Sequence, residues 1–226
     1  MHYEIQYRPA HALAFAHLQP GESVRAEASA MVSMTPNVAV ETQANTGGGL
    51  LKSLKRSMLG GESFFTNRFT AVGSPGHVSF APDLCGDLLV HELTGTQLLI
   101  QGSSYVSAPD SVQIDTKFQG FKGFFSGESL FFLSATGYGP VLMNAFGAVE
   151  TLDLNGELIV DTGHLVAFTS GIEYTVTKAG KGWIQSFLSG EGLVLRMRGQ
   201  GRVYIQSRNP AEYGRAIGAE LPPRRS

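Results

Sequence analysis

The chain has 226 residues, of which 42% are apolar and 16% are charged, and its formal net charge is −2. This balance excludes a disordered segment, because the apolar residues are numerous enough to form a sizeable core. The small net charge excludes bulk electrostatic attraction to nucleic acid or anionic lipid. The low share of charged residues predicts a surface that self-associates and so hides sheet edges and apolar patches.

The N-terminal residues and the cysteine content indicate a cytoplasmic protein. Residues 1–16 carry Glu4 and Arg8 among short apolar pieces, and they lack the basic start and continuous apolar run of a signal peptide. Cys85 is the single cysteine, so no internal disulfide can form, as expected in a reducing compartment. No stretch reaches the ~18 apolar residues of a membrane-spanning helix.

Three sets of predicted elements follow one another along the chain in the same order. Each set has an opening glycine turn with an apolar strand, then a strand pair, then a Gly-Glu turn with further strands. The openings are 20–24, 94–98 and 155–159; the strand pairs 32–40, 106–114 and 166–174 align without gaps; the turns are Gly60-Gly61-Glu62-Ser63, Ser126-Gly127-Glu128-Ser129 and Ser189-Gly190-Glu191-Gly192. Self-similarity over this many positions predicts a fold built by repetition.

Period-2 alternation identifies the elements as β-strands. Apolar and polar residues alternate over 112–116 and 172–176, which places one set of side chains on each face of a strand. The glycine pairs Gly137 with Gly139 and Gly199 with Gly201 are predicted to form turns between strands. The pattern lacks the crossover helices that parallel sheets need, so the strands are expected to be antiparallel.

The predicted fold is all-β, with one domain over residues 1–209 and a C-terminal tail over 210–226. Three repeats, at about 1–84, 85–147 and 148–209, would form antiparallel β-sandwich or double-stranded β-helix-like units around a pseudo-threefold axis. An open solenoid is the alternative, but it would need polar capping units. Residues 211–219 are predicted to form a short helix, with Pro210 in its first turn.

An insertion in the first repeat is predicted to form a short basic amphipathic helix over residues 50–59. Its leucines and Met58 fall within an arc of about 100°, and its basic residues fall outside that arc. Either the helix covers the end of a sheet, or it binds a membrane surface or a partner. The other repeats have aromatic residues at the matching places, which are interpreted as core or oligomer contacts, with a base-stacking platform as the alternative. These residues are Phe118, Phe121, Phe124, Phe125, Trp183 and Phe187.

The sequence offers few candidates for chemistry. Among six histidines, His164 with Asp161 is the one close acid–histidine pair at a strand edge, and it is the candidate for a metal or small-ligand site. A metal needs three or four convergent ligands, and the equivalent positions in the other repeats have no histidine. A structural role is the competing interpretation of His164.

The remaining polar motifs are predicted to shape turns. Ser63 and Ser129 do not lie in the Gly-x-Ser-x-Gly pattern of a nucleophile elbow. The repeated Glu62, Glu128 and Glu191 are expected to hold loops through backbone hydrogen bonds. Cys85 has no activating neighbour in the sequence. We therefore expect no catalytic, cofactor-binding or metal-binding residue, and no enzymatic activity.

The ordered motifs resemble the family of the altered-inheritance-of-mitochondria protein twenty-four. The resemblance is carried by 18–24, 48–63, 160–168, 190–195 and 203–208, and it covers residues 3 to 208. It implies an all-β fold of the kind found in the trp RNA-binding attenuation protein, and an assembly of several chains. Mitochondrial members of the family are linked to inner-membrane organisation, and the resemblance supplies no functional residues to carry over.

The expected function is that of a non-enzymatic, self-assembling β-repeat scaffold or interaction protein that forms a homo-oligomer. One alternative is binding of RNA or single-stranded nucleic acid through aromatic and basic loops, and another is small-ligand or metal binding near His164. The basic residues of the first alternative are Lys52, Lys55, Arg56, Lys117, Lys122, Lys178 and Lys181.

Overall fold

The computed structural model describes residues 1–44, 65–115, 131–178 and 193–222, and these ranges are mostly β-strand with one short C-terminal helix. Every pairing between named strands in these ranges is antiparallel. The predicted all-β class and antiparallel strands are therefore confirmed.

The strands fall into three segments along the chain. The first segment comprises β1 (His2–Gln6), β2 (Leu13–Leu18), β3 (Ser23–Glu27), β4 (Met31–Met34), β5 (Val38–Ala44), β6 (Phe65–Ala71) and β7 (Gly76–Phe80). The second comprises β8 (Gly86–Thr94), β9 (Leu98–Gln101), the short 3-10 helix η1 (Gly102–Ser104), β10 (Tyr105–Pro109), β11 (Val112–Asp115) and β12 (Phe132–Phe146). The third comprises β13 (Val149–Asp161), the 3-10 helix η2 (Thr162–His164), β14 (Leu165–Thr169), β15 (Ile172–Lys178) and β16 (Leu193–Gln206).

Long strands organise the second and third segments. Strand β12 pairs with β8, β9, β10 and β11, and strand β16 pairs with β13, β14 and β15. In the first segment two shorter strands share these pairings, because β7 pairs with β2 and β4 while β6 pairs with β3 and β5. Two further pairings join the segments into one body: β10 with β3, and β14 with β9.

The apolar core crosses both joints between segments. Val106 and Leu142 of the second segment pack in the cluster that fills the first. Val166 and Tyr204 of the third segment pack in the cluster that fills the second. Each joint therefore buries side chains from the later segment in the core of the earlier one, which ties the segments together through burial as well as backbone pairing.

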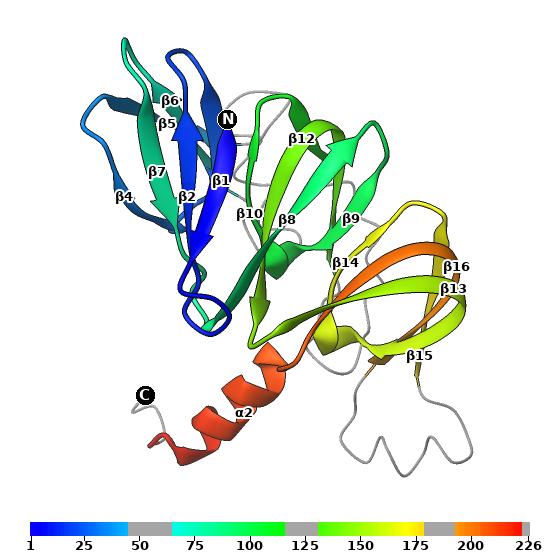
Figure 1. Cartoon of the computed structure of the whole chain (residues 1–226). Coiled ribbons are helices and arrows are strands. Elements are labelled where there is room, and N and C mark those ends of the chain that lie inside the picture. Colours follow the sequence, from blue (N-terminus) through cyan, green and yellow to red (C-terminus); the bar gives the residue numbers. More distant parts are fainter. Residues whose placement is uncertain (45–64, 116–130, 179–192, 223–226) are drawn as a thin grey trace.

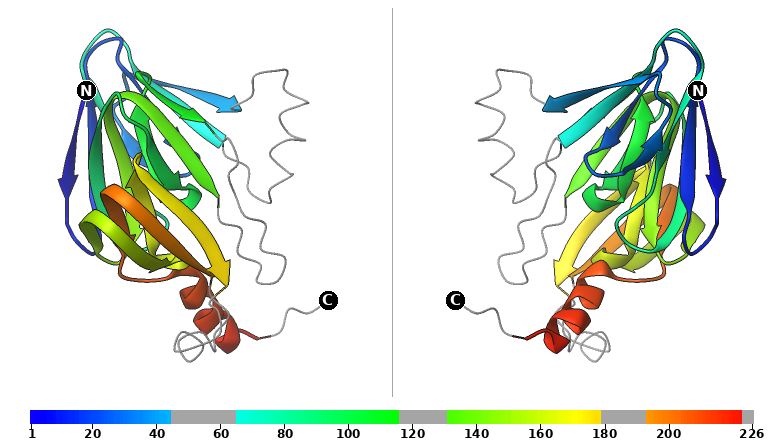
Figure 2. Two further views of the ribbon diagram at one scale, coloured as in Figure 1. Left: turned by 90° about the vertical axis from the view of Figure 1, so that its right-hand side faces the viewer. Right: turned by 90° about the vertical axis from the view of Figure 1, so that its left-hand side faces the viewer.

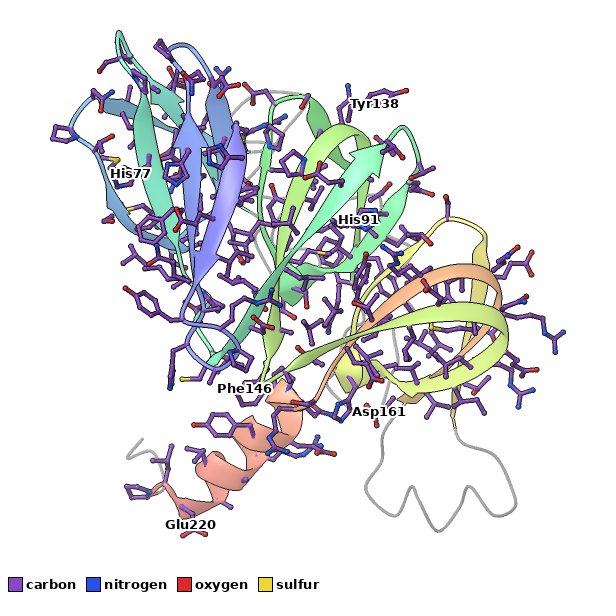
Figure 3. The ribbon with its side chains drawn as sticks, viewed as in Figure 1. His77, His91, Tyr138, Phe146, Asp161 and Glu220 are labelled. Atoms are coloured by element: carbon purple, nitrogen blue, oxygen red, sulfur yellow. The ribbon has the colours of Figure 1, made fainter. Side chains whose placement is uncertain are left out.

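The three segments follow one another across the molecule, with β4 at one side and β13 at the opposite side (Figure 1). The helix α2 (Pro210–Glu220) extends beyond the strands at one end (Figure 2). Asn209 caps it, because Asn209 Oδ1 accepts hydrogen bonds from the amides of Ala211 and Glu212. Tyr213 stacks edge-on against Phe146 where α2 begins (Figure 3). The helix predicted over 211–219 is confirmed.

The prediction for the glycine pairs is wrong in the second and third segments. Gly137 and Gly139 lie inside β12, and Gly199 and Gly201 lie inside β16, where they bend continuous strands instead of ending them. Gly137 and Gly199 have φ of 117° and 135°, which glycine adopts without a steric penalty. The helix predicted over residues 50–59 lies outside the described residues.

Candidate functional site: an unpaired sheet edge

Strand β4 is the outermost strand of the four-stranded sheet β1-β2-β7-β4, and within the described residues its outer side has no strand partner. All four of its residues are exposed. Three of them are large and apolar: Met31 is 39% exposed, Val32 56% and Met34 37%. An exposed apolar edge strand is a template for pairing with another chain. We call residues 31–35 the β4 edge.

A β-bulge shapes the β4 edge. Met31 pairs with Phe80 and Ser33 pairs with Ser79, so Val32 is an extra residue on this strand. The hydroxyl of Ser79 holds the bulge in place. Its Oγ lies 2.6 Å from Ser33 Oγ and accepts a hydrogen bond from the Ser33 amide at 3.0 Å. Val32 is therefore fixed at the surface by a defined backbone geometry.

The same bulge occurs at both joints between segments. The pairing of β10 with β12 skips Val106, and the pairing of β14 with β16 skips Val166. These two valines are 1% and 0% exposed, because each packs in the core of the preceding segment. Val32 has the same place in its strand, but it is 56% exposed and belongs to none of the buried clusters of the described residues.

The opposite side of the molecule has a second unpaired edge. Strand β13 pairs only with β16 in the described part of the chain, and its outer side is unpartnered along residues 158–160. Ile159 is 44% exposed there, and Leu158 is half-buried. Strands β3 and β9 have the corresponding places in the first and second segments. Their outer sides are paired, β3 with β10 and β9 with β14. We call residues 158–160 the β13 edge.

The acid–histidine pair predicted from the sequence is not brought together. Asp161 Oδ1 accepts a hydrogen bond from the amide of Gly163 at 2.8 Å. His164 Nδ1 donates to the carbonyl oxygen of Gln206, also over a short distance of 2.7 Å. Both side chains therefore hold η2 and the end of β16. Asp161, His77 and His91 lie in different parts of the molecule (Figure 3). Within the described ranges, no group of three His, Cys, Asp or Glu side chains is placed to hold a metal ion.

A row of histidines crosses β1, β2 and β7, and sequence analysis missed it. His2 and His17 stack with ring centroids 4.7 Å apart, and His77 follows at 6.0 Å from His17. Glu4 Oε2 lies 3.3 Å from His17 Nε2. Hydrogen bonds from Gln6 and then His17 lower the pKa of Glu4. The strand register creates this row, and that register could not be derived from residues so far apart in the chain.

His91 lies at the joint between the second and third segments. Its Nδ1 lies 2.7 Å from the hydroxyl of Tyr204, across that joint. Burial, followed by the charge of Arg202, lowers the pKa of His91. Burial also raises the pKa of Tyr204. A neutral His91 hydrogen-bonded to a neutral phenol therefore belongs to the packing of this joint.

Several predicted features lie outside the described residues. They are the three Gly-Glu turns with Ser63 and Ser129, the helix over 50–59, the six aromatic residues at the matching places in the other repeats, and all of the basic residues proposed for nucleic-acid binding except Lys178. Nucleic-acid binding and membrane-surface binding therefore stay predictions. Cys85 is exposed. No helix in the described ranges has the length and apolar character needed to cross a membrane.

Comparisons with known proteins place the chain among bacterial relatives. An uncharacterized protein of Streptococcus pyogenes serotype M6 is 32% identical over 212 residues, which are 91% of this chain and 85% of that protein. A crystal structure of a Streptococcus pyogenes protein matches with a TM-score of 0.80 at 28% identity, covering 97% of this chain and 99% of that chain.

A family model also matches this chain and bears on the resemblance predicted from the ordered motifs. The family model described as "Mitochondrial biogenesis AIM24" matches residues 3–208, the same span as the predicted resemblance. With a match over nearly the whole chain and a relative above 30% identity, the chain belongs to the AIM24 family.

Proposed function

We propose that this protein is a non-enzymatic β-repeat scaffold that acts by associating with further copies of itself. The observation that carries the proposal is the exposure of the apolar β4 edge, while the matching strands β10 and β14 are buried. Covering Met31, Val32 and Met34 would remove apolar surface from water at about 25 cal/mol per Å². It would also give partners to the unpaired backbone groups of an edge strand.

We further infer that the three segments are copies of one unit, with boundaries near residues 84 and 147. Support comes from the pairing pattern: β2, β8 and the first part of β13 pair with β7, with the end of β12 and with the end of β16, whereas β5, β11 and β15 pair with β6, with the start of β12 and with the start of β16. The valine bulge recurs at the same place in the three aligned stretches. A repeated unit whose shared features are geometric fits a structural role.

A non-enzymatic role is supported by what the polar candidates do. Asp161 and His164 hold backbone groups, and Ser33 and Ser79 hold the bulge. The arginines Arg196 and Arg198 on β16 lie at 3.3 Å and 3.0 Å from the carboxylate of Glu157. These groups satisfy one another, and they do not converge on a point where a substrate atom could react.

Light scattering on the purified protein tests the proposal. We expect a mass above that of one chain at micromolar concentration, and the Val32→Asp variant is expected to lower it to one chain by placing a charge in the contact. Ile217→Asp is the matched control, because Ile217 is 47% exposed and lies on α2, which extends beyond the strands (Figure 2). A strict monomer for the unmodified protein would overturn the proposal.

A further inference from the structure

We infer that the second copy docks head to tail, with its β4 edge paired antiparallel to the β13 edge of the first. Met34 of one copy would lie opposite Ile159 of the other, and Ser33 opposite Val160. This inference rests on the proposed self-association and specifies its surface, its partner and its register.

The register comes from the two joints inside the chain. At each joint, the strand that follows a valine bulge pairs with the strand that precedes the joint. The three Cα pairs are Ser107–Ala26, Ala108–Arg25 and Pro109–Val24 at the first joint, and Ala167–Ile100, Phe168–Leu99 and Thr169–Leu98 at the second. The two registers are the same relative to the bulged valines, Val106 and Val166.

The two free edges have the residues that this register requires. Residues 32–40 align without gaps with 106–114 and 166–174. The three residues after Val32, which are Ser33, Met34 and Thr35, therefore correspond to 107–109 and to 167–169. On the other side, residues 98–100 come just before Gln101, which caps η1, and residues 158–160 come just before Asp161, which caps η2. The β13 edge therefore corresponds to β9, the strand that pairs with β14. The pairing of β9 with β12 and of β13 with β16 places this correspondence one residue away from the predicted match of 94–98 with 155–159.

Burial supports the same correspondence. Leu98 is fully buried beside β14, whereas its counterpart Leu158 is half-buried; Leu99 is half-buried, whereas its counterpart Ile159 is 44% exposed. On the bulged strands Ala108 and Phe168 are 1% and 0% exposed, whereas Met34 is 37% exposed. Met34 thus occupies a position that is buried at both internal joints, and Leu158 and Ile159 are more exposed than their counterparts on β9.

The chemistry of the two edges is compatible. The first internal joint includes an ion pair, with Arg25 Nε 3.0 Å from Asp110 Oδ1. The second is apolar at the matching position, where Leu99 lies opposite Phe168. Met34 opposite Ile159 would resemble the second joint, and neither edge places a like charge against the other.

Other unpaired strand sides do not carry the same argument. In the described ranges β5, β11 and β15 each pair on one side only, so an open side there is common to all three segments. The outer sides of β4 and β13 differ from these, because in the described ranges the matching strands are paired there, β10 with β3 and β14 with β9. These edges lie at opposite sides of the molecule, so one chain does not pair them with each other (Figure 1). A head-to-tail contact of this kind closes into a ring or extends as a filament.

Disulfide trapping tests the register. In a Cys85→Ser background, Met34→Cys and Ile159→Cys are made as separate proteins, mixed and oxidised mildly. Facing strand residues are close enough for a disulfide. We expect one-to-one heterodimers at about ten times the yield of dimers from either protein alone. Tyr138→Cys replaces Ile159→Cys as the matched control, because Tyr138 is 68% exposed and lies far from both edges (Figure 3).

The outcomes separate this inference from the proposed function. Self-association with efficient disulfide formation by Met34→Cys alone would indicate a symmetric contact, and it would overturn the head-to-tail register while the scaffold proposal survives. A monomer at all concentrations would overturn both. If either variant fails to fold, the neighbouring pair Thr35→Cys and Leu158→Cys makes the same test, with thermal unfolding as the check on folding.

Discussion

At the scale of single residues, Gly156 and Gly199 have similar backbones in different surroundings. They face each other across β13 and β16, with φ of 127° and 135°. A Cβ on Gly199 would lie 2.2 Å from the carbonyl oxygen of Gly171, whereas nothing lies within 4 Å of a Cβ on Gly156. Gly156→Ala therefore introduces backbone strain alone, and Gly199→Ala introduces strain and a clash with backbone.

We expect Gly156→Ala to lower the free energy of unfolding by about 1–3 kcal/mol, and Gly199→Ala to lower it by about 4 kcal/mol or more. Urea unfolding of the two variants at one protein concentration provides the comparison. Equal losses would mean that the close approach of Gly171 to β16 does not constrain residue 199.

We expect His91 to make the stability of the folded protein dependent on pH. Its lowered pKa means that the unfolded chain binds a proton more readily than the folded protein. This contribution to stability is therefore complete above the ordinary histidine pKa of 6.5, and it is lost as the pH falls below that value. We expect the urea concentration at the unfolding midpoint to decrease when the pH is lowered from 7 to 5. The decrease should be smaller in the His91→Gln variant. An identical pH profile in the variant would show that this histidine does not set the dependence.

At the scale of elements, an ion pair joins the turn after β1 to the start of β8. Arg8 donates from Nε and Nη2 to the two carboxylate oxygens of Asp87, at 2.7 Å and 2.8 Å. Asp87 is buried, and this hydrogen bonding raises the pKa of Arg8. Arg8→Ala would leave the Asp87 carboxylate buried without its cation, and we expect it to lower the free energy of unfolding by about 3 kcal/mol.

The double variant Arg8→Ala with Asp87→Asn is the control for this pair. Removing the unpaired charge should restore part of the lost stability, because the neutral amide costs less to bury. The measurement is a double-mutant cycle of unfolding free energies. A double variant less stable than Arg8→Ala alone would show that the carboxylate is stabilised by something other than the arginine.

Some elements could be predicted from the sequence and others could not. The alternation over 112–116 and 172–176 corresponds to β11 and β15, because period-2 patterns depend only on local pleating. The continuity of β12 and β16 was missed, since glycines that bend a strand have the same local signal as glycines that end one. The unpaired edges could not be predicted, because they depend on which strands are neighbours in the sheets. The low share of charged residues predicted a surface that self-associates, but it did not indicate which strands form that surface.

At the scale of the whole molecule, a series of like units is expected to end in two different surfaces. On the proposed repetition, the first unit has a bulged strand whose outer side is unpaired, and the last has an edge strand, β13, whose outer side is also unpaired among the described strands. Repeat proteins commonly protect such ends with polar caps. Here the β4 edge is apolar, so the ends are better suited to meeting each other than to facing water.

This asymmetry predicts how two edge variants behave when mixed. Val32→Asp would disable the β4 edge and keep the β13 edge, while Ile159→Asp would do the reverse. Each protein alone is expected to have the mass of one chain. An equimolar mixture is expected to have the mass of two chains and no more, because one intact edge of each kind remains and nothing extends the pair.

Light scattering on the separate and mixed proteins measures these masses directly. In a symmetric contact between two β4 edges, Ile159→Asp alone would keep the mass of the unmodified protein, and mixing would create no new species. A mixture that stays at the mass of one chain would likewise contradict the head-to-tail contact. The limit at two chains is the specific result, since it requires two different edges that bind only each other.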